Sequence, residues 1–217
     1  TAYRTELPAE PAPGYADYTR WQRDILGDPD DPTSRFTRDI DFWTTELGDA
    51  GAPVVLPGPP GDSGGRVVRD VDAHVITALR EQMSALGASV FHAVHGALTT
   101  TLGRLTGEWD VVVGVPVHGR SAPQWERVVG MFVNTVAVRT RLQPGATVAD
   151  AVACAREAHL RIADHQEVPY ESVVRAVCPN ARSTHDPLTS ILLVGQDVVP
   201  EPDAATAGAG SEASGPN

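Results

Sequence analysis

The sequence predicts an α/β sandwich in which helices flank a mostly buried, mixed sheet. A valine-rich run at 108–120 shows no polar alternation and ends in Gly and Pro, which is typical of a strand buried on both faces. A second β-prone run follows at 128–139, and segments with helical apolar spacing lie on either side of the two runs. Strands and helices mixed in this order favour one α/β unit, and 217 residues suffice for a sizeable core.

The N-terminal quarter predicts a connector followed by two amphipathic helices. Residues 1–14 are polar and rich in proline, as a connector would be. In 15–26 the large apolar residues recur every three or four positions and form one helical face: Tyr15, Tyr18, Trp21 and Ile25. The stretch 27–34 breaks this helix. Ser34 is expected to cap the next helix, whose apolar stripe runs from Phe36 to Leu47.

The central part predicts a loop, a short strand, two helices and the valine-rich strand. The loop at 56–65 is too rich in Pro and Gly for regular structure. A short strand is expected at 66–71. Helices are expected at about 73–86 and 90–105, before the strand at 108–120.

The C-terminal part predicts two more strands and two more helices before a tail. The elements expected are a strand at about 130–141, a helix from 147 to about 164, a helix at 169–177 and a strand at 188–194. Thr147 is the expected N-cap of the first helix, with Asp150 three residues on as its capping-box partner. Residues 198–217 are low in apolar mass and are expected to be disordered.

Composition restricts the classes of partner. A net charge of −11 disfavours nucleic acid as a partner, since neutralising phosphates needs a positive surface. No apolar run approaches the ~18 residues that a membrane span needs, and no signal peptide is evident, so the expected compartment is the cytoplasm. Cys154 and Cys178 lack metal-ligand spacing and are expected to be free thiols.

Individual residues give weak functional signals. His92 and His95 stand three apart on a predicted helix without a nearby carboxylate, which is a poor metal pattern. His118 opens a loop after the buried strand, where a role in a cleft competes with that of an ordinary loop residue. His165 and Glu171 suit the helix ends that they occupy, so a structural role is favoured over a functional one. The chain therefore offers no complete catalytic set and no metal site.

Five segments, in order, resemble the condensation domains of nonribosomal peptide synthetases. YADYTRW (15–21) resembles the family's Tyr-x-Asp-Tyr-Ala-x-Trp, and VVVGVPVHGR (111–120) resembles VGTPVAGR. VVGMFVNTVAVR (128–139) resembles I-G-x-F-V-N-T-x-x-x-R almost throughout. HQEVPYESVV (165–174) resembles H-Q-D-x-P-F-E-x-L-V, and RSTHDPLTSILLV (182–194) resembles R-D-x-S-R-N-P-L-F.

The resemblance implies a fold and a missing part. Family members are about twice as long and fold as two lobes similar to chloramphenicol acetyltransferase around a tunnel. Their HHxxxDG motif lies in the first half, and this sequence contains no such motif. The resemblance therefore implies that 15–197 is most of a C-terminal lobe, incomplete at both ends, and that no catalytic residue lies in this chain.

The resemblance also implies a function in antibiotic-type secondary metabolism. Condensation domains act as acyltransferases that form amide bonds between thioesters carried on the phosphopantetheine of donor and acceptor peptidyl carrier proteins. These carriers and the N-terminal lobe are the implied partners, and no cofactor binds the chain directly. The implied tunnel-lining residues are Gly130, Phe132 and Asn134. The implied structural motif residues are Tyr15, Asp17, Trp21, Arg139, His165, Pro169, Glu171, Arg182 and Pro187, with Arg139 and Arg182 expected to tie motifs together by ion pairs.

Two other functions stay open at this point. FVNTVAVR is of the kind found in peptide-bond-forming domains, not of the kind found in epimerisation or heterocyclisation domains. A condensation-like recruitment domain, similar to the X-domains that dock a cytochrome P450, would keep the same fold with a degraded active-site motif. A free-standing acyltransferase of the same superfamily is the third reading.

Overall fold

The computed structural model of the protein describes residues 13–58, 64–181 and 186–196. Six helices and two strands are formed in this part of the chain: α1 (Tyr15–Leu26), α2 (Arg35–Leu47), α3 (Ala73–Ala85), α4 (Val90–Thr106), β1 (Asp110–Val117), β2 (Asn134–Arg141), α5 (Val148–Ile162) and α6 (Tyr170–Val177). Two single 3-10 turns, η1 (Pro123–Trp125) and η2 (Ala163–His165), join them. The six predicted helices are confirmed. The predicted tail and most of the predicted connector lie outside the described residues.

Side-chain caps fix where the helices begin. The Ser34 hydroxyl accepts a hydrogen bond from the N–H of Thr37 at 3.1 Å, so α2 starts after Ser34. At α5, Thr147 and Asp150 bond each other's backbone N–H groups at 3.2 and 2.9 Å, which is the predicted capping box. At α1, the carboxylate of Asp17 accepts from the N–H of Gly14 at 2.8 Å.

The sheet is an antiparallel ribbon with one further contact. β1 and β2 pair from Asp110↔Arg141 to Val117↔Asn134. Gly114, in the middle of β1, also donates to the carbonyl of Ile191 and accepts from the N–H of Leu193, each at 2.9 Å. A Cβ atom at Gly114 would lie 2.6 Å from the Leu192 side chain and 3.2 Å from the Thr189 hydroxyl, so glycine favours the close approach of the C-terminal segment. β1 therefore pairs with β2 in antiparallel orientation and forms one parallel bridge, between Gly114 and Leu192.

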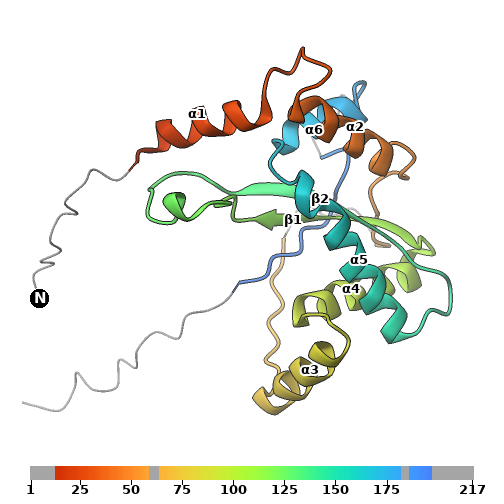
Figure 1. The fold of residues 1–217 in the computed structure, drawn as a ribbon. Helices are drawn as coiled ribbons and strands as arrows, with labels where there is room; N and C mark the ends of the chain where they lie inside the picture. The colour runs from red at the N-terminus through yellow and green to blue at the C-terminus, as the bar shows by residue number, and fades with distance from the viewer. Residues whose placement is uncertain (1–12, 59–63, 182–185, 197–217) are drawn as a thin grey trace, which may run out of the picture.

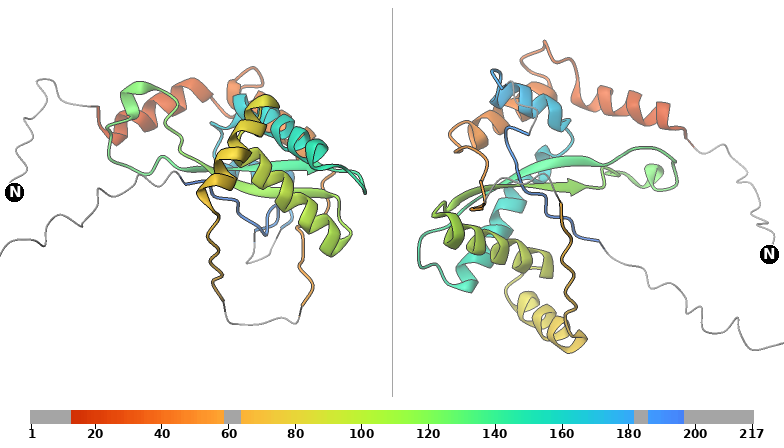
Figure 2. Two further views of the ribbon diagram at one scale, coloured as in Figure 1. Left: turned by 90° about the horizontal axis from the view of Figure 1, so that it is seen from below. Right: turned by 180° about the vertical axis from the view of Figure 1, so that it is seen from behind.

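Helices cover both sides of this ribbon (Figure 1). α4 and α5 pack against one side, with α3 attached to α4, and α2 and α6 lie together on the other. The views from below and behind show the same layering (Figure 2). The core between the layers contains Val111, Val113 and Val138, which are fully buried, as the reading of 108–120 as a doubly covered strand requires.

Three predicted strands differ from the structure. Residues 66–71 form no strand: their valines are exposed, and among the described residues no second strand pairs with them. β2 begins at Asn134, because 128–133 forms a loop whose Phe132 turns into an aromatic cluster with α1. In 188–194 only Leu192 forms a bridge, through Gly114.

Candidate functional site

The side chain of Asn134 connects two of the motif segments by hydrogen bonds. Its Nδ2 donates to the carbonyl oxygens of Gln166 and Val168 at 2.8 and 2.9 Å, and its Oδ1 accepts from the N–H of Tyr170 at 3.1 Å. Three hydrogen bonds thus use both amide hydrogens and the carbonyl oxygen. The family resemblance implies that this amide faces a tunnel. In the structure this amide holds the turn between η2 and α6 against the start of β2.

The loop before Asn134 is attached to α1 by an aromatic cluster. The ring of Phe132 packs on Tyr18 with centroids 4.4 Å apart, and Trp125 meets Tyr18 edge to face at 5.5 Å. Trp21 adds a contact with Trp125 at 5.5 Å. The guanidinium of Arg120 lies 4.0 Å from the centroid of Phe132, a cation–π contact. The apolar face predicted for 15–26 therefore packs on the loop of the β1–β2 ribbon.

Gly130 is explained by this packing. A Cβ atom at Gly130 would lie 2.2 Å from the ring of Tyr15, so the loop fits over α1 only without a side chain there. The hydroxyl of Tyr15 then donates to the carbonyl of Met131 at 2.5 Å. The resemblance assigns Gly130 to the tunnel wall, whereas the close neighbour in this structure is Tyr15.

Arg139 is buried and holds two acidic residues. Its Nε and Nη2 donate to the two carboxylate oxygens of Asp110 at 2.8 and 2.6 Å, and it also pairs with the carboxylate of Asp49 and bonds the carbonyl of Glu46 at 2.7 Å. The bonds with Asp110, and then those with Asp49, raise the pKa of Arg139 above its ordinary value. The same contact lowers the pKa of Asp49. This ion-pair set joins β1, β2 and the end of α2.

His165 and Tyr170 serve as anchors on either side of the turn. His165 Nδ1 lies 2.7 Å from the carboxylate of Asp39, and its ring stacks on Phe42 with centroids 3.7 Å apart. The hydroxyl of Tyr170 donates to Asp186 at 2.9 Å. Burial first, and then Asp186, raises the pKa of Tyr170, while the hydroxyl of Thr189 opposes the shift.

The other predicted motif residues have simple positions. Pro169 precedes the first residue of α6, and the exposed Glu171 lies in its first turn. Pro187 is half-buried next to Asp186, whose carboxylate accepts from the N–H groups of Leu188 and Thr189 at 2.8 and 3.0 Å. The prediction for Arg182 lies outside the described residues.

These segments enclose an open cavity of about 330 Å³. It is lined by α1 residues including Tyr15 and Tyr18, by residues 131–135 and by residues 169–171. Glu171 is its one charged lining residue, so the walls suit an uncharged chain better than a phosphate. Burial first, followed by the nearby Glu167 and Tyr15, raises the pKa of Tyr18, which keeps its phenol neutral at ordinary pH.

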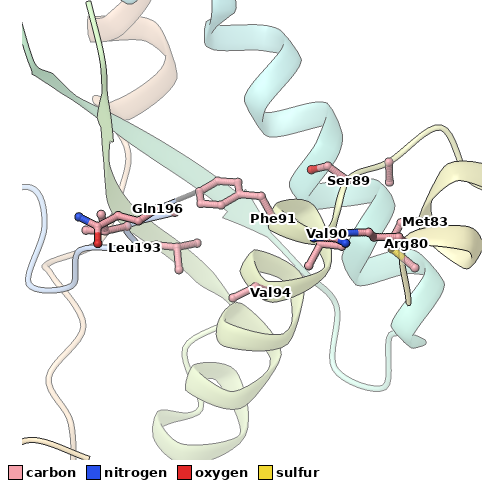
Figure 3. Close-up of a pocket in the computed structure, with 11 residues that line it drawn as sticks. Arg80, Met83, Ser89, Val90, Phe91, Val94, Leu193 and Gln196 are labelled. Carbon is pink, nitrogen blue, oxygen red and sulfur yellow. The ribbon is translucent and has the colours of Figure 1, made fainter. Parts of the chain in front are cut away.

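A larger cavity lies elsewhere and contains none of the predicted site residues. It measures about 650 Å³ and opens between α3, the start of α4 and residues 193–196 (Figure 3). Its walls are mostly apolar: Phe91 and Val94 lie between Leu193 at one end and Met83 at the other, and the ring of Phe91 points toward Leu193. We take the smaller cavity as the candidate site, because four motif segments form or support it.

The candidate site offers shape, neutral polar groups and one carboxylate, that of Glu171. Within residues 13–58, 64–181 and 186–196, no three His, Cys, Asp or Glu side chains gather as a metal site would need. No helix of the described chain is long and apolar enough to cross a bilayer. Sequence reasoning missed Asp39, Asp49 and Asp186, because each is an ordinary acidic residue until the fold brings it to its partner.

Comparison with known proteins places the chain in a family. The condensation-domain family matches residues 2–209. The chain is 36 % identical over 191 residues to an isonitrile lipopeptide synthase of Mycobacterium tuberculosis, covering 84 % of this chain and 8 % of that protein. It is 30 % identical over 191 residues to a phosphinothricin tripeptide synthetase of Streptomyces viridochromogenes, covering 84 % of this chain and 17 % of the relative. The chain belongs to the condensation-domain family.

Solved structures agree on the fold. The X-domain from teicoplanin biosynthesis matches with a TM-score of 0.72 and 26 % identity, covering 82 % of this chain and 41 % of that one. The first condensation domain of the CDA synthetase matches with a TM-score of 0.68 and 23 % identity, covering 87 % and 40 %. The fold is therefore the chloramphenicol acetyltransferase-like arrangement of condensation domains, and the chain spans about two fifths of each solved domain.

Proposed function

We propose that this chain is the C-terminal lobe of a condensation domain that forms peptide bonds in nonribosomal peptide biosynthesis. In this proposal the lobe supplies one wall of the substrate tunnel, and the catalytic histidine belongs to an N-terminal lobe that is not in this sequence. The carrier proteins for donor and acceptor, with their phosphopantetheine arms, are the partners.

The observation that carries the proposal is the convergence of the motif segments. Asn134 draws together residues 166–170 and the start of β2, while the aromatic cluster joins the preceding loop to α1. Apart from Glu171, the lining of the resulting cavity is uncharged, which suits the amide-containing arm of a carrier protein. Holding two tethered substrates in register is worth about 7–11 kcal/mol in well-oriented reactions, so a rigid wall is a contribution to rate.

The test is an amide-formation assay with carrier-bound substrates and the whole protein that contains residues 1–217. Val133 lines the cavity and is 52 % exposed, so Val133→Trp should fill the cavity without disturbing the core. We expect Val133→Trp to raise KM for the carrier-bound substrate at least several-fold. Val148→Trp, at an exposed position of α5 outside the cavity, is the matched control.

Two results would contradict this proposal. Equal activity of Val133→Trp and Val148→Trp would show that the cavity takes no part in binding the carrier-bound substrate. Amide formation by residues 1–217 alone would show that the catalytic group lies within this chain.

A recruitment domain is the second candidate function. The observation in its favour is the TM-score of 0.72 with the X-domain from teicoplanin biosynthesis, which has also been solved as a complex with OxyB. In this case the whole protein would bind a cytochrome P450 and form no amide bond. Pull-down of the P450 together with the turnover assay separates the two functions, and an intact HHxxxDG motif in the preceding sequence would favour catalysis.

A further inference from the structure

Two histidines meet in the interface between α4 and α5, away from the candidate site. Nδ1 of His95 on α4 lies 2.9 Å from Nε2 of His159 on α5. On its other side, Nε2 of His95 lies 3.3 Å from the hydroxyl of Thr140 on β2. The His95 side chain is fully buried, so this imidazole pair connects three elements in the interior.

Proton counting shows what the pair tolerates. With both rings neutral, one nitrogen of the 2.9 Å contact carries a hydrogen and the other accepts it. If His159 donates, His95 keeps its hydrogen on Nε2 and directs it to Thr140; the opposite tautomers also satisfy the contact. A proton added to the outer nitrogen of the donating ring leaves the contact in place, whereas a proton on the accepting nitrogen places two N–H groups face to face. The contact is then lost, and a charge stays buried.

The surroundings provide no compensating negative charge. The ring of His92, from α4, lies 5.4 Å from the ring of His159, and Arg156 from α5 acts on His92. β2 presents only the Thr140 hydroxyl to His95. Among the described residues no carboxylate bonds or pairs with either ring of the imidazole pair. Burial first, and then the neighbouring histidines, lowers the pKa of both His95 and His159 to about 4.

We infer that the His95–His159 pair makes the α4–α5 interface acid-sensitive: the interface is closed while both rings are neutral and opens when the pair takes up protons. This device is independent of the proposed function. Opening of the α4–α5 interface would also change the 650 Å³ cavity. Phe91, in the first turn of α4, lines that cavity and meets the ring of His159 edge to face at 5.3 Å. Gly96 is the other close contact, since a Cβ there would lie 2.8 Å from the backbone of Ala151.

The direction of the effect follows from linkage. Because the pKa of each imidazole is about 4 in the folded protein and about 6.5 in the unfolded chain, the open state binds more protons between these values. The stability of the interface is therefore complete above about pH 6.5 and falls as the pH is lowered toward 4. At pH 5 the opening equilibrium should rise roughly thirty-fold for each imidazole.

Hydrogen–deuterium exchange measured peptide by peptide tests this in the whole protein. After correction for intrinsic exchange, amides of α4 and α5 should lose at least tenfold in protection between pH 7.5 and pH 5. Amides of α2 in the same molecule should change little and serve as the internal control. Exchange at the imidazole carbons, read by mass spectrometry, should place the midpoints of His95 and His159 well below their values in denaturant.

Variants separate this inference from general acid sensitivity. His159→Gln removes one of the two titrating rings while keeping a polar side chain next to His95, and it should reduce the selective loss of α4 and α5 protection at pH 5 by the roughly thirty-fold share of one imidazole. His74→Gln, at an exposed position of α3, should leave the loss unchanged. Equal acid sensitivity of α2, α4 and α5, or imidazole midpoints unchanged from denaturant, would overturn the inference. Exchange at the imidazole carbons tests the inference in the unmodified protein, so the test remains possible if a variant fails to fold.

Discussion

Asn134 and Tyr170 are 36 residues apart in the chain and joined by a hydrogen bond of 3.1 Å from the Tyr170 N–H to the Asn134 side-chain oxygen. The same side chain bonds two carbonyls within the four residues before Tyr170. Gln22 donates one further side-chain hydrogen bond to this turn, to the carbonyl of Glu167 at 3.3 Å, and Asn134 supplies three. Asn134, within the β-prone run, thus fixes the turn before α6 against the start of β2.

Replacement of Asn134 by Ala should destabilise the protein by about 2–3 kcal/mol, since three hydrogen bonds are lost and buried carbonyls lose their donors. Asn134→Asp should be at least as harmful, because a carboxylate would face the carbonyls of Gln166 and Val168. Urea denaturation measures both changes. Gln143→Ala is the control, because this position is exposed and its side chain forms no hydrogen bond with the residues that the structure describes. A loss below about 0.5 kcal/mol in Asn134→Ala would contradict the role given to Asn134.

Arg139→Lys should cost about 3 kcal/mol. The buried guanidinium makes two parallel bonds to Asp110 and further contacts with Asp49 and Glu46, and one ammonium group cannot reproduce this geometry. Arg141 provides the matched control, because it approaches the carboxylates of Asp49 and Asp110 at 3.4 and 3.6 Å from a half-exposed position. Arg141→Lys should cost less than about 1 kcal/mol. Equal effects of the two substitutions in urea denaturation would show that burial of Arg139 does not matter.

Gly130→Ala should cost about 1–3 kcal/mol, because the new Cβ would collide with the ring of Tyr15 and force the loop off α1. The cost should fall to a few tenths in a Tyr15→Ala background, which removes the ring. A double-mutant cycle of thermal unfolding measures this coupling. Gly51→Ala, where no atom lies within 4 Å of the added Cβ, should be nearly neutral in both backgrounds. Additive costs would refute a direct contact between residues 15 and 130.

The fold was predictable where the signal is local. Helical spacing and caps located all six helices, and the unbroken valine run located β1. The strand predictions were wrong where strand formation depends on a pairing partner. Residues 66–71 contain valines but have no partner strand among the described residues, and residues 188–194 form a bridge with β1 only at Gly114. A strand depends on its neighbour, which pattern reading along one segment does not reveal.

The candidate site was predictable only as a set of motifs. The resemblance named Asn134, Arg139 and His165, but their partners are residues far away in sequence. His165 pairs with Asp39 across 126 positions, and Arg139 reaches Asp49 across 90. No local pattern distinguishes these acids from other acids of a chain with net charge −11. Likewise, the spacing of His92 and His95 suggested only a weak metal pattern and gave no sign that His95 contacts His159, which is 64 residues away in the sequence.

Tyr170 differs from the phenylalanine usual in the motif it resembles, and Asp186 accounts for the added hydroxyl. The hydroxyl donates to Asp186 at 2.9 Å, while the same carboxylate caps the N–H groups of Leu188 and Thr189. Tyr170→Phe should therefore cost only about 1 kcal/mol, whereas Asp186→Ala, which removes all three bonds, should cost about 2–3 kcal/mol. In the double variant the Tyr170→Phe cost should fall nearly to zero, as measured by urea denaturation. Full additivity would mean that the hydroxyl is stabilised by Thr189 or by water instead of Asp186.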